Sequence, residues 1–363
     1  MELSLFDYSR LRSPRDNQLT SSRRYKDTLE LKFNYRCHRY RAISRLLWEA
    51  LMKAFDEFAK SELSPTVLLK QTETKGYALI RGLLSKEAVG AALADVTRVL
   101  FGAGWLQEGC SPQERVPATG AACGDPDPRF KRVYQQVFNL ESIHRLPHES
   151  ALQGVMRMLT EGPVLVHPKP IGRLIFPNCE QLVTHAHQDY EFMGGDTEFY
   201  TVWIPLHDCP IEAGSLRILE GSHRHGIQHH ERENLHVPEI PEGVAAGDVW
   251  VGGQVNAGDV LIFHSLTVHA ASPNLSNQMR LSVDCRFQDV RRVFNPANLV
   301  FAGESGKSWE KTYADWTSDE LKYYWKKIRL TLQPSKMELE NLAATAEPLA
   351  KRARYLRMVS QLN

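Results

Sequence analysis

The segment MRLSVDCRFQ, residues 279–288, alternates between polar and apolar side chains. Successive side chains of a β-strand point to opposite faces, so Arg280, Ser282, Asp284 and Arg286 would share one face of a strand. The opposite face would carry apolar side chains and one thiol, namely Leu281, Val283, Cys285 and Phe287. One polar and one apolar face predict a wall between a lined cavity and a hydrophobic core.

Five further short runs of strand-forming residues precede this segment: RLIF (173–176), EFYTVWIPL (198–206), SLRIL (215–219), DVWVGG (248–253) and DVLIFH (259–264). Short strands separated by turn residues at this spacing predict a β-barrel or a sandwich. We therefore expect a mainly β protein with flanking α-helices. Its core over residues 160–290 is expected to be a double-stranded β-helix, the cupin-like jelly roll, which protects its sheet edges by doubling the sheet.

The sequences on both sides of this core are predicted to be helical extensions of a single domain that spans residues 1–363. Apolar residues at helical spacing predict an amphipathic helix over residues 40–60, inside an N-terminal extension of residues 1–70. Residues 300–363 form the C-terminal extension, which is predicted to be helical and basic over residues 318–358. We interpret it as outer helices that pack on a sheet, and the alternative is a basic helix that binds a membrane or a partner.

The charges of the chain are balanced, with 44 Lys and Arg against 43 Asp and Glu. This balance does not favour nucleic acid or a membrane surface as a partner. The chain has no apolar run long enough to predict a spanning helix, and its first residues lack the layout of a secretory signal. The six cysteines are widely spaced without a C-x-x-C pair, which predicts neither a zinc ribbon nor a disulfide framework. We expect a cytoplasmic protein.

The segment THAHQDYEFMGGD, residues 184–196, contains the short motif His187-x-Asp189. On an extended chain these two side chains point the same way and can bind one ion. His269 follows in the later segment LTVHAASPN. Two imidazoles and one carboxylate on one face of a metal form the facial triad of non-haem Fe(II) oxygenases, which leaves coordination positions open. We therefore predict His187, Asp189 and His269 as metal ligands.

Arg280 is the predicted binding residue for an anionic cosubstrate. An unpaired buried guanidinium is costly, so its face of the strand needs a ligand or a partner. The planar fork of Arg280 suits a carboxylate such as the distal one of 2-oxoglutarate, and Ser282 would add a hydroxyl donor to the same oxygens. The alternative is an internal ion pair between Arg280 and an acidic residue such as Asp284.

The substrate pocket is the least specific part of the prediction. Tyr190, Phe192 and Trp105 are candidates for its walls, because small-molecule pockets are mostly apolar with a few polar anchors. These aromatic residues are as often plain core. Arg286 lies on the predicted cavity face beyond Arg280, and we expect it to hold an acidic group of the substrate.

Together these segments resemble the phytanoyl-CoA dioxygenase (PhyH-like) family of Fe(II)/2-oxoglutarate-dependent oxygenases. The matching stretches are GYALIRGLLSKEAV (76–89), HQDYEF (187–192), WIPLHDCPIEAGSLRILEGSHRHG (203–226) and AGDVLIFHSLTVHAASPNLSNQMRLSV (257–283). The resemblance implies that His187, Asp189 and His269 bind iron and that Arg280 pairs with 2-oxoglutarate. It also places Thr201 where relatives have a hydroxyl residue near the cosubstrate.

The resemblance implies a dioxygenase that uses Fe(II), 2-oxoglutarate and O₂ and releases succinate and CO₂. Its expected reaction is the oxidation, most simply the hydroxylation, of a C–H bond in a small-molecule substrate of natural-product metabolism. Halogenating relatives replace the carboxylate that Asp189 retains, so a halogenase is not expected. Two alternatives stay open, a cupin-like metalloenzyme that does not use 2-oxoglutarate and a non-catalytic binding module on the same fold.

Overall fold

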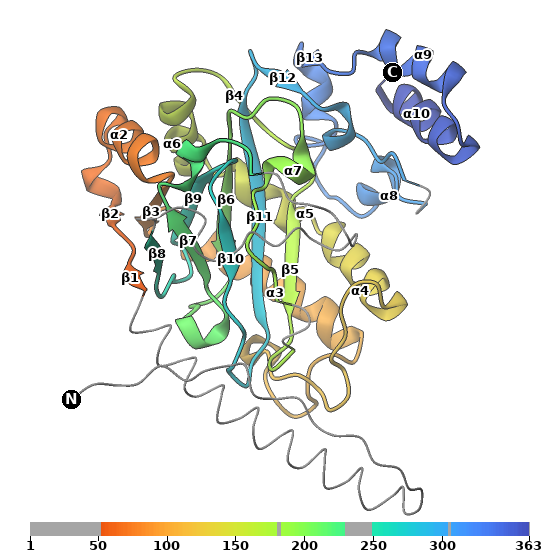
Figure 1. Ribbon diagram of the computed structural model, residues 1–363. Coiled ribbons are helices and arrows are strands. Elements are labelled where there is room, and N and C mark those ends of the chain that lie inside the picture. Colours follow the sequence, from red (N-terminus) through yellow and green to blue (C-terminus); the bar gives the residue numbers. More distant parts are fainter. Residues whose placement is uncertain (1–51, 180–182, 229–248, 304–305, 363) are drawn as a thin grey trace, which may run out of the picture. The chain divides into compact units, whose positions relative to one another are not determined.

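The computed structural model of the chain describes residues 52–179, 183–228, 249–303 and 306–362, and it contains two principal β-sheets (Figure 1). The strands of the larger sheet are β2 (Glu57–Ala59), β3 (Tyr77–Arg81), β4 (Val164–Val166), β5 (Ile171–Ile175), β6 (Phe199–Pro205), β9 (Val260–His264) and β11 (Arg280–Asp289). The strands of the smaller sheet are β1 (Lys53–Ala54), β7 (Leu216–Glu220), β8 (Val249–Gly252) and β10 (His269–Ala271).

The larger sheet is organised around β11, the strand predicted at residues 279–288. Every residue of β11 is buried. One edge of β11 pairs with β6, and the other edge pairs first with β5 and then with β4, always antiparallel. The full order is β2-β3-β9-β6-β11-β4, with β5 beside β11. Strand β11 therefore has neighbours along both of its edges.

The chain passes back and forth between the two sheets after β6. Strands β7 and β8 belong to the smaller sheet, β9 to the larger, β10 to the smaller and β11 to the larger. An isolated bridge between His187 and His269 adds the segment around His187 to the free edge of β10. This alternation between two antiparallel layers is a jelly roll, so the predicted fold class is confirmed.

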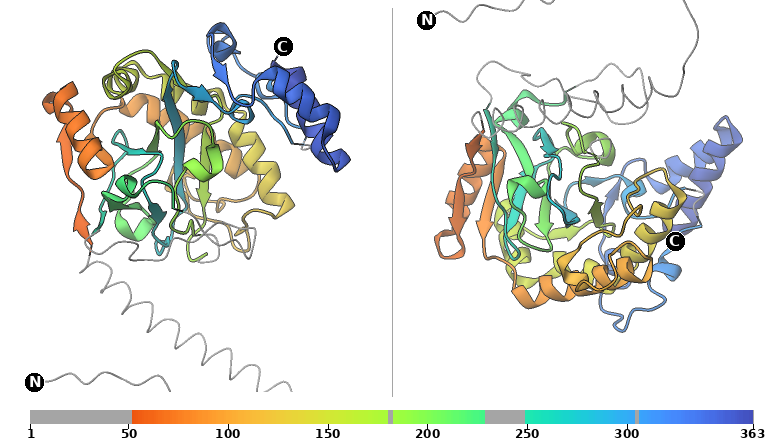
Figure 2. Two further views of the ribbon diagram at one scale, coloured as in Figure 1. Left: turned by 45° about the horizontal axis from the view of Figure 1, so that its top comes forward. Right: turned by 90° about the horizontal axis from the view of Figure 1, so that it is seen from below.

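The two faces of the larger sheet pack against different partners. Its inner face meets the smaller sheet in an apolar cluster that includes Tyr77, Leu79, Trp203, Leu216, Ile218, Val251, Leu261, Phe263 and Ala271. Its outer face, which carries Leu281, Val283, Cys285 and Phe287 of β11, packs against helices. The helices are α3 (Lys86–Gly102), α4 (Pro128–Phe138), α5 (Glu141–Arg145) and α6 (Ser150–Thr160), which lie along one side of the strands (Figure 2). The predicted division of β11 into a polar face and an apolar core face is therefore confirmed, and the cavity on the polar side stays a prediction.

Helix α2 (Pro65–Lys75) leads directly into β3 because Gly76 ends it in the left-handed conformation, with φ +79°. The Ser64 hydroxyl caps its start by accepting a hydrogen bond from the Val67 N–H. A Cβ on residue 76 would come within 2.7 Å of Thr267 Oγ1, which donates a hydrogen bond to the Gly76 carbonyl. Glycine therefore allows this close approach of two chain segments.

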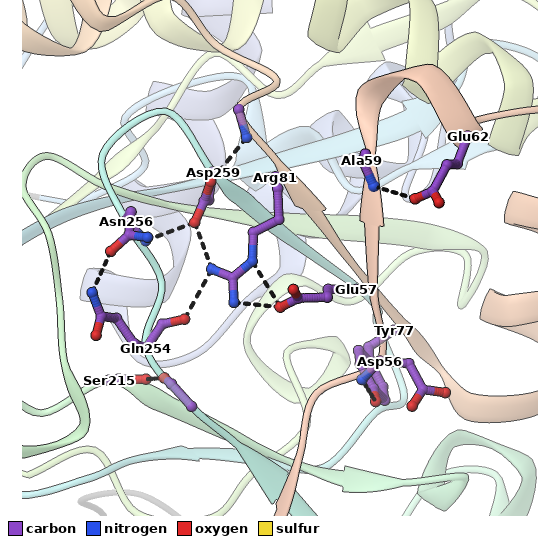
Figure 3. Close-up of polar contacts among 12 residues, drawn as sticks. Asp56, Glu57, Ala59, Glu62, Tyr77, Arg81, Ser215, Gln254, Asn256 and Asp259 are labelled. Carbon is purple, nitrogen blue, oxygen red and sulfur yellow. Dashed lines mark hydrogen bonds and ion pairs between the residues drawn. The ribbon is translucent and has the colours of Figure 1, made fainter.

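The far end of β3 is held by an ion-pair network around Arg81 (Figure 3). Its guanidinium donates to Glu57 at 2.8 and 2.5 Å, to Asp259 at 2.6 Å and to the Gln254 carbonyl at 3.0 Å. Asp259 also accepts a hydrogen bond from the Gly82 N–H at 2.9 Å. The network joins β2, β3 and the turn before β9.

The helix predicted over residues 40–60 is wrong from residue 52 onward, and residues 40–51 lie outside the described part of the chain. In place of a helix, β1 pairs in parallel with β8, and β2 pairs in parallel with β3. Phe55, between the two short strands, packs in the cluster between the sheets. Pairing at the sheet edges and burial of this ring outweigh the helical spacing of the apolar residues.

The α-helices in the described part of the C-terminal extension are the short α8 (Trp309–Thr312), α9 (Lys336–Thr345) and α10 (Leu349–Leu362). The helix predicted from residue 318 is wrong up to residue 335, where the structure has turns, a 3₁₀ segment and β13 (Thr331–Leu332), which pairs with β12 (Val293–Phe294). Tyr323 has a φ of +53°, which a continuous helix does not allow. Trp325 packs with Trp309 and Trp316 in a second aromatic core.

The described residues from Lys53 onward form one compact unit. Because residues 1–51 lie outside the description, the single-domain organisation of residues 1–363 stays a prediction. Within the described residues, no helix is both long enough and apolar enough to cross a membrane.

Replacing Leu281 with alanine tests the assigned core face of β11. This side chain is 0 % exposed, so its truncation should lower the free energy of unfolding by about 2–5 kcal/mol. Leu349 is 73 % exposed, and Leu349→Ala should change the same quantity by less than about 0.5 kcal/mol. Urea unfolding of both variants measures the difference, and equal losses would contradict the assignment.

Candidate metal centre and cosubstrate pocket

The structure brings His187, Asp189 and His269 together between the two sheets. The Nε2 atoms of His187 and His269 lie 3.5 and 3.7 Å from Asp189 Oδ1, and all three side chains are buried. One ligand atom from each lies within 4.8 Å of the others. The backbone N–H groups of His187 and His269 each donate to the other residue's carbonyl at 3.0 Å, which fixes the pair in register.

The two residues of the His-x-Asp motif differ in backbone conformation, and a turn between them brings their side chains together. His187 is in the bridge to β10, whereas Asp189 has helical φ and ψ at the start of α7 (Tyr190–Met193). The intervening Gln188 amide is fully buried and donates to the Gly226 and Leu266 carbonyls at 2.9 and 2.7 Å. These bonds hold the turn and leave the flanking side chains free to converge.

Both imidazoles have one nitrogen committed to the backbone. His187 Nδ1 donates to the His185 carbonyl at 2.7 Å, and His269 Nδ1 donates to the Thr267 carbonyl at 3.0 Å. Each Nε2 then carries the lone pair that a metal ion requires. Burial lowers the pKa of His269 to about 3, so this ring is neutral and able to bind a metal at physiological pH.

Asp189 is held through one oxygen only. Its Oδ2 accepts hydrogen bonds from Thr201 Oγ1 at 2.5 Å and from Arg286 Nε and Nη2 at 3.2 and 2.9 Å. Its Oδ1 faces the two imidazoles. Burial alone would raise the pKa of Asp189, but the Arg286 guanidinium and the imidazoles hold it well below its usual value. The carboxylate is therefore a preformed anionic ligand.

This arrangement gives Thr201 and Arg286 contacts that the sequence did not predict. We expected Thr201 at the cosubstrate and Arg286 at an acidic group of the substrate, but both contact Asp189. Arg286 is directly opposite Thr201 in the pairing of β11 with β6, so the two side chains share the inner face of the sheet. Only the strand register reveals this juxtaposition.

Arg280 is a buried cation without an internal carboxylate partner among the described residues. It is 2 % exposed, its Nη1 donates to Ser282 Oγ at 3.0 Å, and its Nε has no hydrogen-bond partner. Asp284, the alternative partner, instead accepts from Arg173 of β5 at 2.6 Å. The internal Arg280–Asp284 pair considered from the sequence is therefore wrong. Burial lowers the pKa of the Arg280 guanidinium, an effect that a bound carboxylate would oppose.

Further polar atoms on the same inner face are buried and unpartnered. They are Trp203 Nε1, Asp284 Oδ1 and Arg286 Nη1, and Trp203 lies opposite Asp284 in the strand register. Buried polar atoms require a partner, because each unsatisfied group carries a desolvation cost of about 1–3 kcal/mol. A dicarboxylate such as 2-oxoglutarate fits this wall, since Arg280 needs an anion and three of the four unpartnered atoms are donors.

The three aromatic candidates for the substrate pocket lie in different surroundings. Phe192 on α7 is 55 % exposed, and its ring centroid lies 5.4 Å from that of His187. Tyr190 is half-buried at the start of the same helix. Trp105, by contrast, is 5 % exposed. It packs against Phe130 and Phe176 in the outer core, the apolar cluster between the outer face of the larger sheet and the helices. The structure thus brings only Phe192 into contact with a triad residue.

Helix α7 is fixed to the segment that follows β12. The Met193 carbonyl at its end accepts hydrogen bonds from Asn295 Nδ2 at 2.8 Å and Asn298 Nδ2 at 3.0 Å. Gly194 and Gly195 then pass close to Asn295. The position of Phe192 therefore depends on residues 295–298, a link that no sequence motif indicated.

Comparison with known families agrees with this geometry. Residues 72–282 match the family model described as phytanoyl-CoA dioxygenase (PhyH), which is more than half of the chain. This chain belongs to the phytanoyl-CoA dioxygenase family. Membership confirms the expectation of a dioxygenase that uses Fe(II), 2-oxoglutarate and O₂.

Two curated relatives in this comparison are the 1-deoxypentalenic acid 11-beta-hydroxylases of Streptomyces arenae and Streptomyces exfoliatus. Each is 27 % identical over 237 residues, which cover 61 % of this chain and 80 % of the relative. Similar solved structures include the epimerase SnoN in complex with Fe³⁺, alpha ketoglutarate and nogalamycin RO, at 21 % identity, TM-score 0.47 and coverage of 63 % and 85 %. The carbocyclase SnoK from nogalamycin biosynthesis matches at 24 % identity, TM-score 0.45 and coverage of 65 % and 88 %.

The two buried arginines of this dioxygenase should respond in opposite ways to the same substitution. Arg280→Met removes an uncompensated buried charge and should raise the free energy of unfolding of the metal-free protein by about 1 kcal/mol or more. Arg286→Met leaves Asp189 buried without its charged partner and should lower the free energy of unfolding by about 3–5 kcal/mol. Urea unfolding in the presence of a chelator measures both. A loss of stability in Arg280→Met would show that its charge is compensated internally.

Proposed function

We propose that His187, Asp189 and His269 hold the Fe(II) of this dioxygenase, and that Arg280 with Ser282 binds the distal carboxylate of 2-oxoglutarate. The proposal rests chiefly on Arg280, a buried guanidinium for which the described part of the chain supplies no carboxylate partner. It lies on the same inner face of β11 as Arg286, which holds Asp189. The oriented Nε2 atoms of the two histidines and the ionised Asp189 support the metal assignment.

When bound, iron with 2-oxoglutarate and O₂ supplies the oxidising chemistry, and succinate and CO₂ leave as co-products. The residues of the chain supply binding and orientation. Asp189 offers a negative charge through Oδ1, the two imidazoles offer lone pairs at Nε2, and Arg280 offers a positive charge to the far end of the cosubstrate. The apolar cluster between the sheets excludes water from this region, which strengthens each of these charge interactions.

The proposed reaction is the hydroxylation of a C–H bond in a small-molecule natural product. The curated relatives are named as hydroxylases of 1-deoxypentalenic acid, which supports both the reaction and the class of substrate. The half-exposed ring of Phe192 beside His187 supports an apolar wall on the substrate side of the metal, with Tyr190 as its neighbour on α7. Such a wall suits a substrate whose reacting carbon carries no charge.

The remaining expectations are part of the same proposal. We propose one catalytic domain for residues 1–363, a cytoplasmic location and no nucleic-acid or membrane partner. The balanced charge of the chain supports the last of these. Trp105 keeps only a packing role in this proposal, because its ring contacts lie in the outer core.

Anaerobic titration of the purified protein with Fe(II) and 2-oxoglutarate tests the assignment. The wild-type protein should develop the visible metal-to-ligand charge-transfer band of the chelated keto acid, and His187→Ala should lose the metal and the band. Arg280→Met should require about thirtyfold more 2-oxoglutarate or still more, because removal of one partner of a buried charge pair costs about 2–5 kcal/mol. Arg81→Met, which removes a comparable guanidinium at the far end of β3, should titrate as the wild type does.

Two outcomes would contradict the proposal. A wild-type protein that binds iron but never shows the band would favour a cupin-like metalloenzyme that does not use 2-oxoglutarate. A wild-type protein that binds no metal would favour a non-catalytic binding module.

A further inference from the structure

The two oxygens of Asp189 have different partners, and this difference has a consequence for the metal. We propose that Arg286 and Thr201 are positioning residues that restrict Asp189 to a single bond with the metal, through Oδ1, and so keep open the coordination position that O₂ requires. This inference rests on the proposed function, because it takes His187, Asp189 and His269 as the metal ligands.

The hydrogen bonds to Asp189 all converge on one oxygen. Oδ2 accepts hydrogen bonds from Thr201 Oγ1 at 2.5 Å and from Nε and Nη2 of Arg286 at 3.2 and 2.9 Å. A carboxylate oxygen has about two lone-pair sites, so three donors saturate Oδ2. The neighbours of Oδ1 are the two imidazole nitrogens that face the proposed metal position. Only Oδ1 is therefore available as a ligand.

The donors that hold Oδ2 come from a rigid part of the fold. Arg286 and Thr201 are directly opposite each other on β11 and β6, which pair over seven residues on each strand. His187 and His269, in contrast, belong to the layer of the smaller sheet. The carboxylate is thus held from one sheet and presented to imidazoles of the other. To turn Oδ2 toward the metal, the protein would have to break the buried Arg286–Asp189 pair, which would leave a buried charge without its partner.

The number of open positions follows from this restriction. Three single-bonded ligands on one face of an octahedral ion leave the three positions of the opposite face. The keto acid of the cosubstrate would take two of them, and one would remain for O₂. A carboxylate that bonds through both oxygens would occupy that last position. Arg286 and Thr201 therefore act through Asp189 on the access of O₂, without touching either the metal or O₂.

Nitric oxide, which occupies the O₂ position on Fe(II) and gives a characteristic electron paramagnetic resonance signal, is the probe. The anaerobic complex of the wild-type protein with Fe(II) and 2-oxoglutarate should bind nitric oxide. In Arg286→Met the signal should fall by about tenfold or more while iron stays bound. Substitution of residues that hydrogen-bond to metal ligands typically lowers metal affinity or activity by about 10–100-fold. Thr201→Val removes one of the three donors with little change in volume and should cause a smaller loss in the same direction.

Two further measurements make the test decisive. Arg81→Met serves as the matched control, because it removes a forked arginine–carboxylate pair at the far end of β3 (Figure 3) and should keep the full signal. A crystal structure of the Arg286→Met complex with Mn(II) and 2-oxoglutarate should show both oxygens of Asp189 on the metal, against one in the wild type. Should Arg286→Met fail to fold, Thr201→Val is examined in the same way.

Failure of this inference is distinguishable from failure of the proposed function. A full nitric oxide signal in both Arg286→Met and Thr201→Val, with single-bonded Asp189 in the crystal, would overturn the positioning role and leave the metal assignment intact. Retention of iron and of the charge-transfer band in His187→Ala would overturn the metal assignment itself, and this inference with it.

Discussion

The constraint on which this structure depends is the burial of charged side chains along one face of β11. A charge inside a protein must be paired or bound, because its desolvation cost is several kcal/mol. The charged residues of β11 meet this requirement differently. Arg286 pairs with Asp189, Asp284 pairs with Arg173, and Arg280 has no internal carboxylate partner among the described residues. The first two arginines have their charges compensated inside the protein, and Arg280 creates the need for an external anion.

The same constraint explains why the inner face of the larger sheet has an apolar part and a polar part. The inner face of the larger sheet is apolar where it meets the smaller sheet through Tyr77, Leu79 and Trp203, and polar where β11 carries its charges. A ligand that entered the apolar part would find no partner for its charge. The polar part offers a cation and a carboxylate ligand, and the imidazoles of the smaller sheet's layer lie opposite that carboxylate. A metal and a dicarboxylate can therefore bind side by side between the two sheets.

The sequence was most informative where a local pattern or a family motif is enough to assign a residue's position. The alternation in residues 279–288 was enough to predict which side chains of β11 face the core, and the family motifs indicated the residues that converge as a triad. The contacts of Arg286 and Thr201 could not be predicted, because they depend on the register between β11 and β6. Residues 52–60 were predicted as a helix for a related reason, since the local spacing of apolar residues carries no information about the strands that pair with them. Trp105 and Phe192 look alike as aromatic residues in a sequence, and only packing separates a core ring from one beside His187.

The two asparagine side chains on the Met193 carbonyl make the wall beside His187 a composite of distant segments. Helix α7 carries Phe192, and residues 295–298 hold the end of that helix, although about a hundred positions separate them. These segments form one structural unit, because a change in either alters the same wall. A chimaera that exchanges α7 between members of the family retains its geometry only when residues 295–298 are exchanged with it.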